Sequence, residues 1–177
     1  MRLSQGAASN HKNPAVEPAD HAIGRTRGGL TSKLHLVVDG WGLPLSVLLT
    51  AGQAGDNPQL LPLLDTIRVP RPGPGRPRRR PTQVVADKAY SHPSTRTALR
   101  RRRVTFTCPQ RSDQLARRVA RGSAGGRPPN VDTETYKRRN VVERCFNRLK
   151  QWRGIATRYD KTAVNYLGGI LLTSIVL

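Results

Sequence analysis

Apolar and polar positions along the chain predict short strands and helices joined by polar turns. Residues 33–39 alternate between apolar and polar, and a second apolar run follows at 43–50. The turn residues Gly40 and Gly42 lie between the two runs, so the pattern predicts an antiparallel hairpin. The same kind of pattern predicts further strands over 83–87 and 104–107, and helices over 57–67, 91–101 (capped by Ser91 or Ser94), 132–153 and 162–177.

The mixture of strands and helices favours an α/β or α+β layer architecture. Residues 1–29 are polar and show no period, which predicts a loop or frayed end, with one domain over 30–177. Two basic stretches, 70–81 rich in Pro and Gly and 111–130 rich in Gly, are expected to be exposed loops. Each is either an ordinary solvated loop or a contact with DNA.

The charge of the chain points to a polyanionic partner. The 177 residues contain 31 Lys and Arg against 11 Asp and Glu, a net charge of +20. This excess goes beyond what solubility requires and makes nucleic acid the first partner to consider, although a GC-rich genome also favours Arg codons.

The two cysteines, Cys108 and Cys145, have neither a metal-site spacing nor that of a disulfide framework, so a reducing cytoplasm is expected. The N-terminus lacks the apolar core of a signal peptide, and the apolar run 168–177 is too short to span a bilayer.

Carboxylates are scarce, so few residues can form an acidic site. Asp87 follows an apolar strand, and α/β folds place their sites at the carboxyl ends of strands. A turn or helix-capping role is the alternative for Asp87. Asp39 begins an Asp-Gly turn, and we expect it to be structural.

A second carboxylate stands out on the helix predicted over 132–153. Tyr136, Arg139, Glu143 and Lys150 share one narrow face at helical spacing, and Glu143 borders the apolar stripe. Glu143 is therefore placed to face a cleft between cations. An ordinary amphipathic helix with charged neighbours is the alternative.

The spacing Y-x2-R-x3-E-x6-K of these four residues resembles the signature of DDE transposases of the insertion-sequence-4-like group. Five ordered segments also resemble the insertion-sequence-5 family, and together the motifs cover roughly residues 15–177. These segments are GRTRGGLTSKLHLVVDGWGLPL, TAGQAGDNPQL, VVADKAYSH, RGSAGGRPP and ATRYDK.

The resemblance implies a ribonuclease-H-like fold, a mixed sheet flanked by helices, and an enzyme that cuts and joins DNA at element ends. It implies that Asp87 is the second catalytic Asp, that Glu143 is the catalytic Glu, and that both hold two Mg²⁺ ions about 4 Å apart. The DNA contacts it implies are Tyr136, Arg139 and Lys150. The implied partner is double-stranded DNA, as terminal repeats and target, in the nucleoid; a homodimer in the DNA complex is left open.

The sequence departs from the family pattern before the hairpin, where a first catalytic Asp should end a strand. Only Glu17 and Asp20 precede the hairpin, and neither follows an apolar strand. We therefore expect an N-terminally truncated or frameshifted chain that lacks the first strand of the sheet and the first catalytic Asp, and that retains DNA affinity but loses strand transfer. The alternative is programmed frameshifting, in which an upstream frame supplies the missing Asp. Two functions remain, a transposase or a non-catalytic DNA-binding remnant, while an RNA-associated protein would leave the Tyr136–Lys150 spacing unexplained.

Overall fold

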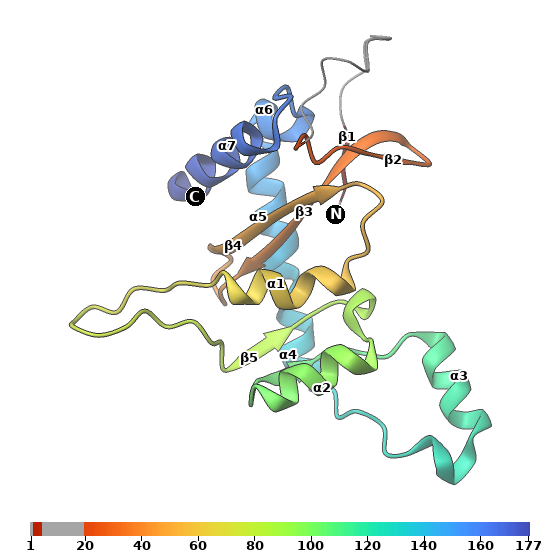
Figure 1. Cartoon of the computed structure of the whole chain (residues 1–177). Helices are drawn as coiled ribbons and strands as arrows, with labels where there is room; N and C mark the ends of the chain where they lie inside the picture. The colour runs from red at the N-terminus through yellow and green to blue at the C-terminus, as the bar shows by residue number, and fades with distance from the viewer. Residues whose placement is uncertain (1, 5–19) are drawn as a thin grey trace. The chain divides into compact units, whose positions relative to one another are not determined.

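The structure is a computed structural model that describes residues 2–4 and 20–177 (Figure 1). It is a mixed α/β structure that divides into two compact units. Unit 1 consists of Met1–Gly55 and Val141–Leu177, and unit 2 of Asp56–Asn140. Each unit has its own small sheet, and the two are described separately below.

The sheet of unit 1 is built around β3 (Gly29–Val38), which pairs antiparallel with β4 (Pro44–Ala51). Leu34 faces Leu49 in this register, and the bonded pairs continue from Ser32 to Val37 before a local irregularity. The predicted hairpin is thus confirmed.

Two short strands, β1 (Arg2–Ser4) and β2 (Gly24–Thr26), also pair antiparallel with β3, which lies between them. The expectation of a loop is wrong for these two segments. Both strands are short and pair through backbone groups, so the sequence shows no alternation of apolar and polar residues that would predict them. Residues 5–19 of the expected loop, Glu17 included, lie outside the described residues.

Three helices complete unit 1: α5 (Val141–Lys150), α6 (Arg153–Thr157) and α7 (Ala163–Val176). In Figure 1, α5 passes behind β3 and β4. Helix α5 contacts β3, and α7 contacts β4. The buried core of the unit consists of Leu34, Cys145, Phe146, Leu149, Ile155, Tyr166 and Ile170. Burial of one large apolar side chain contributes about 1.5–3 kcal/mol, so this core holds the unit together.

The last predicted helix, over 162–177, is confirmed by α7, and the Thr162 side chain accepts the cap hydrogen bond from Asn165 N.

Crossing a bilayer needs about 20 apolar residues in a helix. Within the described part of the chain, no helix combines the length and apolar character needed to cross a membrane.

The helix predicted over 132–153 is interrupted. The chain instead forms α4 (Thr133–Lys137), the 3-10 turn η5 (Arg138–Asn140) and then α5. An asparagine and two valines follow one another at the interruption, and all three are weak helix formers. The single face predicted for four residues is therefore not a face of one regular α-helix.

Unit 2 contains a parallel pair of strands, β5 (Gln83–Val85) and β6 (Thr105–Thr107), in which Val84 faces Phe106. Both predicted strands are confirmed. The helix predicted over 57–67 is present as η2 (Asn57–Gln59) followed by α1 (Leu60–Asp65). The unit buries Leu60, Leu63, Leu64, Ile67, Leu99 and Val104, each at most 6% exposed.

The helix predicted over 91–101 is α2 (Pro93–Arg101), and its cap is His92 rather than a serine. His92 Nδ1 accepts a hydrogen bond from Ser94 N at 3.3 Å. Proline at the first helical position disfavours a helical conformation for the residue before it, which leaves His92 extended and places it at the cap.

The basic segment 70–81 is a loop, as expected. Within it, Arg78 forms an isolated β-bridge with Val69, the residue just before the segment. The basic segment 111–130 is not a loop throughout, because it contains α3 (Ser112–Ala120) and the 3-10 turn η4 (Gly122–Gly125). No Gly or Pro falls within α3, whereas the glycines begin at 122. The prediction treated the whole segment as one loop, although its first half is helical and only its second half is rich in glycine.

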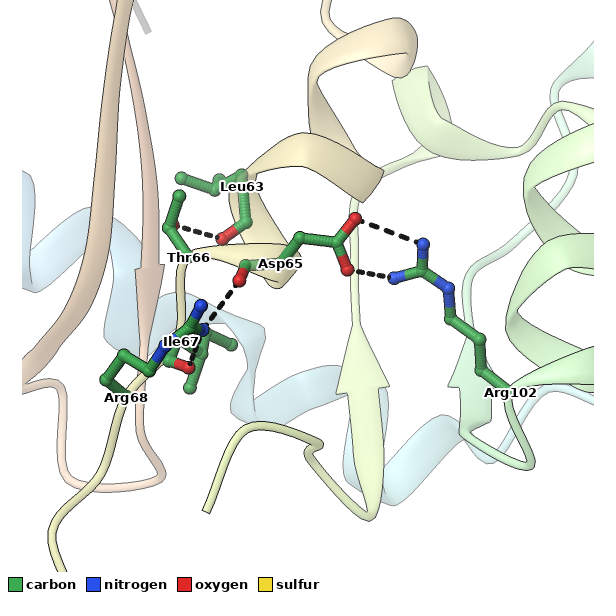
Figure 2. Close-up of polar contacts among 6 residues, drawn as sticks. All are labelled: Leu63, Asp65, Thr66, Ile67, Arg68 and Arg102. Carbon is green, nitrogen blue, oxygen red and sulfur yellow. Dashed lines mark hydrogen bonds and ion pairs between the residues drawn. The ribbon is translucent and has the colours of Figure 1, made fainter. Parts of the chain in front are cut away.

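The ends of α1 and α2 are joined by a forked ion pair (Figure 2). Arg102 Nη1 and Nη2 donate to the two carboxylate oxygens of Asp65 at 2.6 and 3.2 Å. The side chains are 37% and 59% exposed, so solvent screens the pair, and we expect it to contribute less than about 1 kcal/mol.

Candidate active site

Asp87 lies just beyond the end of β5, where the chain turns into the 3-10 turn η3 (Lys88–Tyr90). Its Oδ1 accepts a hydrogen bond from Lys88 N at 2.6 Å, and its backbone carbonyl accepts one from Cys108 Sγ at 3.1 Å. The side chain remains 55% exposed. Asp87 therefore fits both sequence interpretations, since it is a strand-end carboxylate and also caps a turn.

Two other predicted site residues, Arg139 and Tyr136, lie beside Asp87. Arg139 Nη1 is 2.8 Å from Asp87 Oδ1, and the same nitrogen donates to the Tyr136 hydroxyl at 3.3 Å. The guanidinium also lies over the Tyr136 ring, 5.2 Å from its centre. Unit 2 thus gathers an acid, a guanidinium and a phenol at one point.

The surroundings of Asp87 keep two neighbouring neutral groups, the Tyr136 phenol and the Cys108 thiol, protonated. Burial raises the pKa of Tyr136, the Arg139 charge opposes this, and the Asp87 carboxylate raises it further. Burial, with a smaller contribution from Asp87, raises the pKa of the Cys108 thiol to about 11. Tyr136 is therefore a hydrogen-bond donor at neutral pH, and Cys108 is a thiol rather than a nucleophilic thiolate.

Glu143 and Lys150 lie on α5 in unit 1. They are seven residues apart, which places them on one face of that helix. Glu143 is exposed and Lys150 half-buried, while Cys145, Phe146 and Leu149 are buried. The buried side chains of Cys145, Phe146 and Leu149 confirm the apolar stripe predicted for this helix.

Of the predicted site residues, Asp87 and Glu143 carry the carboxylates that could each donate to a hard cation. Both are solvent-accessible, so they can exchange ligands with a hydrated divalent ion, and carboxylate oxygen is the donor that Mg²⁺ prefers. Over residues 2–4 and 20–177, no group of three or more His, Cys, Asp or Glu side chains is arranged to hold a metal ion.

Asp39 has the structural role predicted for it. Its Oδ1 accepts hydrogen bonds from Trp41 N and Leu43 N, both at 2.9 Å, and so fixes the turn between β3 and β4. The two cysteines, Cys108 and Cys145, are free and buried.

Arg158, in the segment ATRYDK, has a structural role that the sequence pattern does not indicate. Arg158 is 5% exposed, has a left-handed φ of 53°, and stacks on Tyr166 at 4.9 Å. An arginine next to Tyr-Asp carries no local signal of burial, because its partners are distant in sequence. Its guanidinium donates to the backbone carbonyls of His21, Ala22, Asp160 and Lys161 and to the Ser32 hydroxyl.

Residues 8–177 match the family described as the transposase DDE domain. The chain therefore belongs to the DDE transposase family, whose members catalyse DNA cleavage and strand transfer. The match covers all of the predicted site residues and nearly the whole chain.

Two curated relatives are named as transposases of insertion sequence elements. One, for element IS6501 from Brucella ovis, is 34% identical over 143 residues, which is 81% of this chain and 94% of the relative. The other, for element IS402 from Burkholderia cepacia, is 36% identical over 139 residues, which is 78% of this chain and 57% of the relative. The chain is thus a transposase of insertion-sequence type. No solved structure gives a significant match.

Proposed function

We propose that this transposase binds double-stranded DNA and performs metal-dependent cleavage and strand transfer, with Asp87 and Glu143 as the metal-binding carboxylates. The observation that carries the proposal is the gathering of Asp87, Arg139 and Tyr136 at the end of β5. An exposed strand-end acid beside a guanidinium is suited to a negatively charged phosphodiester held next to a cation.

Each residue has a distinct proposed role. When bound, two Mg²⁺ ions would activate a water or 3′-hydroxyl and neutralise the charge that develops on the leaving oxygen. Arg139 would hold a phosphate through its planar fork, and Lys150 would supply a second positive charge. Tyr136, which stays protonated, would donate a hydrogen bond to a phosphate oxygen.

The contact between Arg139 and Asp87 has a consequence for this chemistry. Arg139 Nη1 lies against the same oxygen of Asp87 that accepts the Lys88 backbone hydrogen bond. The Asp87 carboxylate would hold the cation, and Arg139, which lies against that carboxylate, would be placed to bind a phosphate next to it.

The finer family assignment belongs to the same proposal. The Tyr136–Arg139–Glu143–Lys150 spacing supports membership of the insertion-sequence-4-like group, and the ordered segments support the insertion-sequence-5 family. A ribonuclease-H-like fold is proposed from the same motifs.

A second candidate is a DNA-binding protein without catalysis. The observation that favours it is that Asp87 has structural roles, as the cap of η3 and as the ion-pair partner of Arg139.

Incubation of the protein with labelled terminal-repeat duplex, with Mg²⁺ or with EDTA, separates the two candidates. The first predicts strand breaks that require Mg²⁺, at DNA concentrations where binding is saturated. Saturated binding without breaks in Mg²⁺ would support the second, and absence of DNA binding would contradict both.

A further inference from the structure

Unit 2 contains a large cavity that the proposed active site does not use. It has a volume of about 1090 Å³ and lies between the start of α2, β6, and the segment from α3 to residue 130. Ligand pockets commonly measure roughly 300–1000 Å³, so the cavity has room for several phosphate groups. Neither Asp87, Arg139 nor Tyr136 lines it.

The lining of the cavity is strongly basic. Eight of its side chains are arginines, and Asp113 is its one acid. Asp113 pairs with Arg111 at 3.1 Å and with Arg117 at 4.0 Å. Asp113 thus serves two of the eight arginines, and no other carboxylate in the lining neutralises the remaining six.

Two of these arginines have buried N–H groups with no acceptor. They are Nε of Arg96 and both Nε and Nη1 of Arg118. A buried donor without an acceptor costs about 1–3 kcal/mol, more when it is charged, so these groups favour a ligand that brings acceptors. Phosphate oxygens are suitable acceptors because they match the guanidinium fork.

The two guanidiniums also influence each other. Burial lowers the pKa of Arg96, and the positive charge of Arg118 lowers it further, although Cys108 opposes the effect. Like charges that are close together destabilise each other until an anion lies between them. The arrangement therefore favours a negatively charged occupant on electrostatic grounds as well.

The cavity wall connects to the candidate active site through Cys108. Arg96 Nη2 donates to the Cys108 carbonyl at 2.5 Å, while Cys108 Sγ donates to the Asp87 carbonyl at 3.1 Å. Arg96 also stacks on Phe106 of β6 at 5.4 Å. One residue therefore fixes the positions of a cavity arginine and of the candidate catalytic Asp.

We propose that this cavity binds backbone phosphates of the DNA substrate, with Arg118 and Arg121 as contacts, and so holds the DNA at a second point in the unit that contains Asp87. The inference rests on the proposed function in that the phosphates belong to DNA. Arginines there would position the strand without reading its sequence.

The test measures how DNA affinity changes with salt. Labelled terminal-repeat duplex is titrated with the full chain from about 50 mM to about 200 mM salt, because each phosphate contact contributes about −0.9 to the slope of log affinity against log salt. Arg118→Gln and Arg121→Gln should each make the slope shallower by about 0.9, and the double variant by about 1.8. Arg121 is exposed, so its variant tests the cavity without disturbing the core.

Arg101→Gln is the matched control, because Arg101 is exposed on α2, carries the same charge and does not line the cavity. Its slope should equal that of the unaltered protein. Slopes that are equal in all variants would overturn the cavity proposal and leave the proposed function intact. Absence of DNA binding by the unaltered protein would overturn both, and an arginine-dependent preference for duplex RNA would overturn the assignment to DNA.

Discussion

Arg139 Nη1 lies 2.8 Å from Asp87 Oδ1, and this contact joins the 3-10 turn before α5 to the end of β5. Arg139 is 29% exposed and Asp87 55%, so solvent reaches both groups. Such a pair stabilises a fold only weakly, by about 1 kcal/mol or less. Its position beside Tyr136 points to function rather than to stability.

Arg139→Gln is therefore expected to separate these two roles. It should lower the free energy of unfolding by less than about 1 kcal/mol in urea titrations. A charged hydrogen bond contributes about 1.5–3 kcal/mol, so DNA cleavage should fall roughly tenfold to a hundredfold. Arg138→Gln, at the exposed neighbouring position, is the control and should change neither quantity. A large loss of stability in Arg139→Gln would mean that the residue is structural.

Arg158→Lys should destabilise unit 1. The buried guanidinium donates to oxygens that are distant in sequence, including the Ser32 hydroxyl and the Ala22 carbonyl. The ammonium group of lysine cannot reproduce the planar set of donors of a guanidinium. We expect the free energy of unfolding to fall by about 2–4 kcal/mol. The exposed Arg153 on α6 provides the control Arg153→Lys, expected to be neutral. Equal stabilities for the two variants would contradict the role given to Arg158.

Tyr166 should make the protein less stable at alkaline pH. Burial raises its pKa from 10.0 to about 12, so the folded state retains the phenolic proton that the unfolded state loses. This contribution to stability is complete below pH 10.0 and is lost as pH rises towards about 12, with a slope of up to about 1.4 kcal/mol per pH unit.

Tyr166→Phe removes that titration. Denaturant titrations across this range should show a shallower fall in the free energy of unfolding than in the unaltered protein. At neutral pH the variant should be less stable by about 1 kcal/mol, since it loses the 2.7 Å bond from the hydroxyl to the Ile155 carbonyl. Parallel pH profiles would exclude Tyr166 as the source.

Much of the fold followed from the sequence because the signals are local. The β3–β4 hairpin has alternating side chains and a turn between them, and α7 has a threonine cap and an apolar run. The strands β1 and β2 escaped prediction because their pairing with β3 uses backbone groups of short, polar segments. The helix α3 escaped because its arginines were grouped with the glycines that follow it.

The candidate site could be predicted only in part. The position after an apolar strand selected Asp87, the motif spacing selected Tyr136 and Arg139, and the structure gathers these three. The spacing also suggested one uninterrupted helix, but a 3-10 turn interrupts it, a detail that depends on tertiary contacts as well as on propensity. The arginine cavity was beyond prediction, because residues from 91 to 130 form it by folding together.

The most direct test of the central claim compares DNA cleavage by Asp87→Asn and Glu143→Gln with that by two controls. Asp65 also pairs with an arginine and is 59% exposed, and Glu134 pairs with Lys137 at 2.7 Å, so Asp65→Asn and Glu134→Gln match them in chemistry and setting. Mg²⁺-dependent breaks in terminal-repeat duplex should disappear in both site variants and persist in both controls, with DNA affinity unchanged throughout. Breaks that persist in Asp87→Asn or Glu143→Gln would contradict the claim that these carboxylates hold the metal.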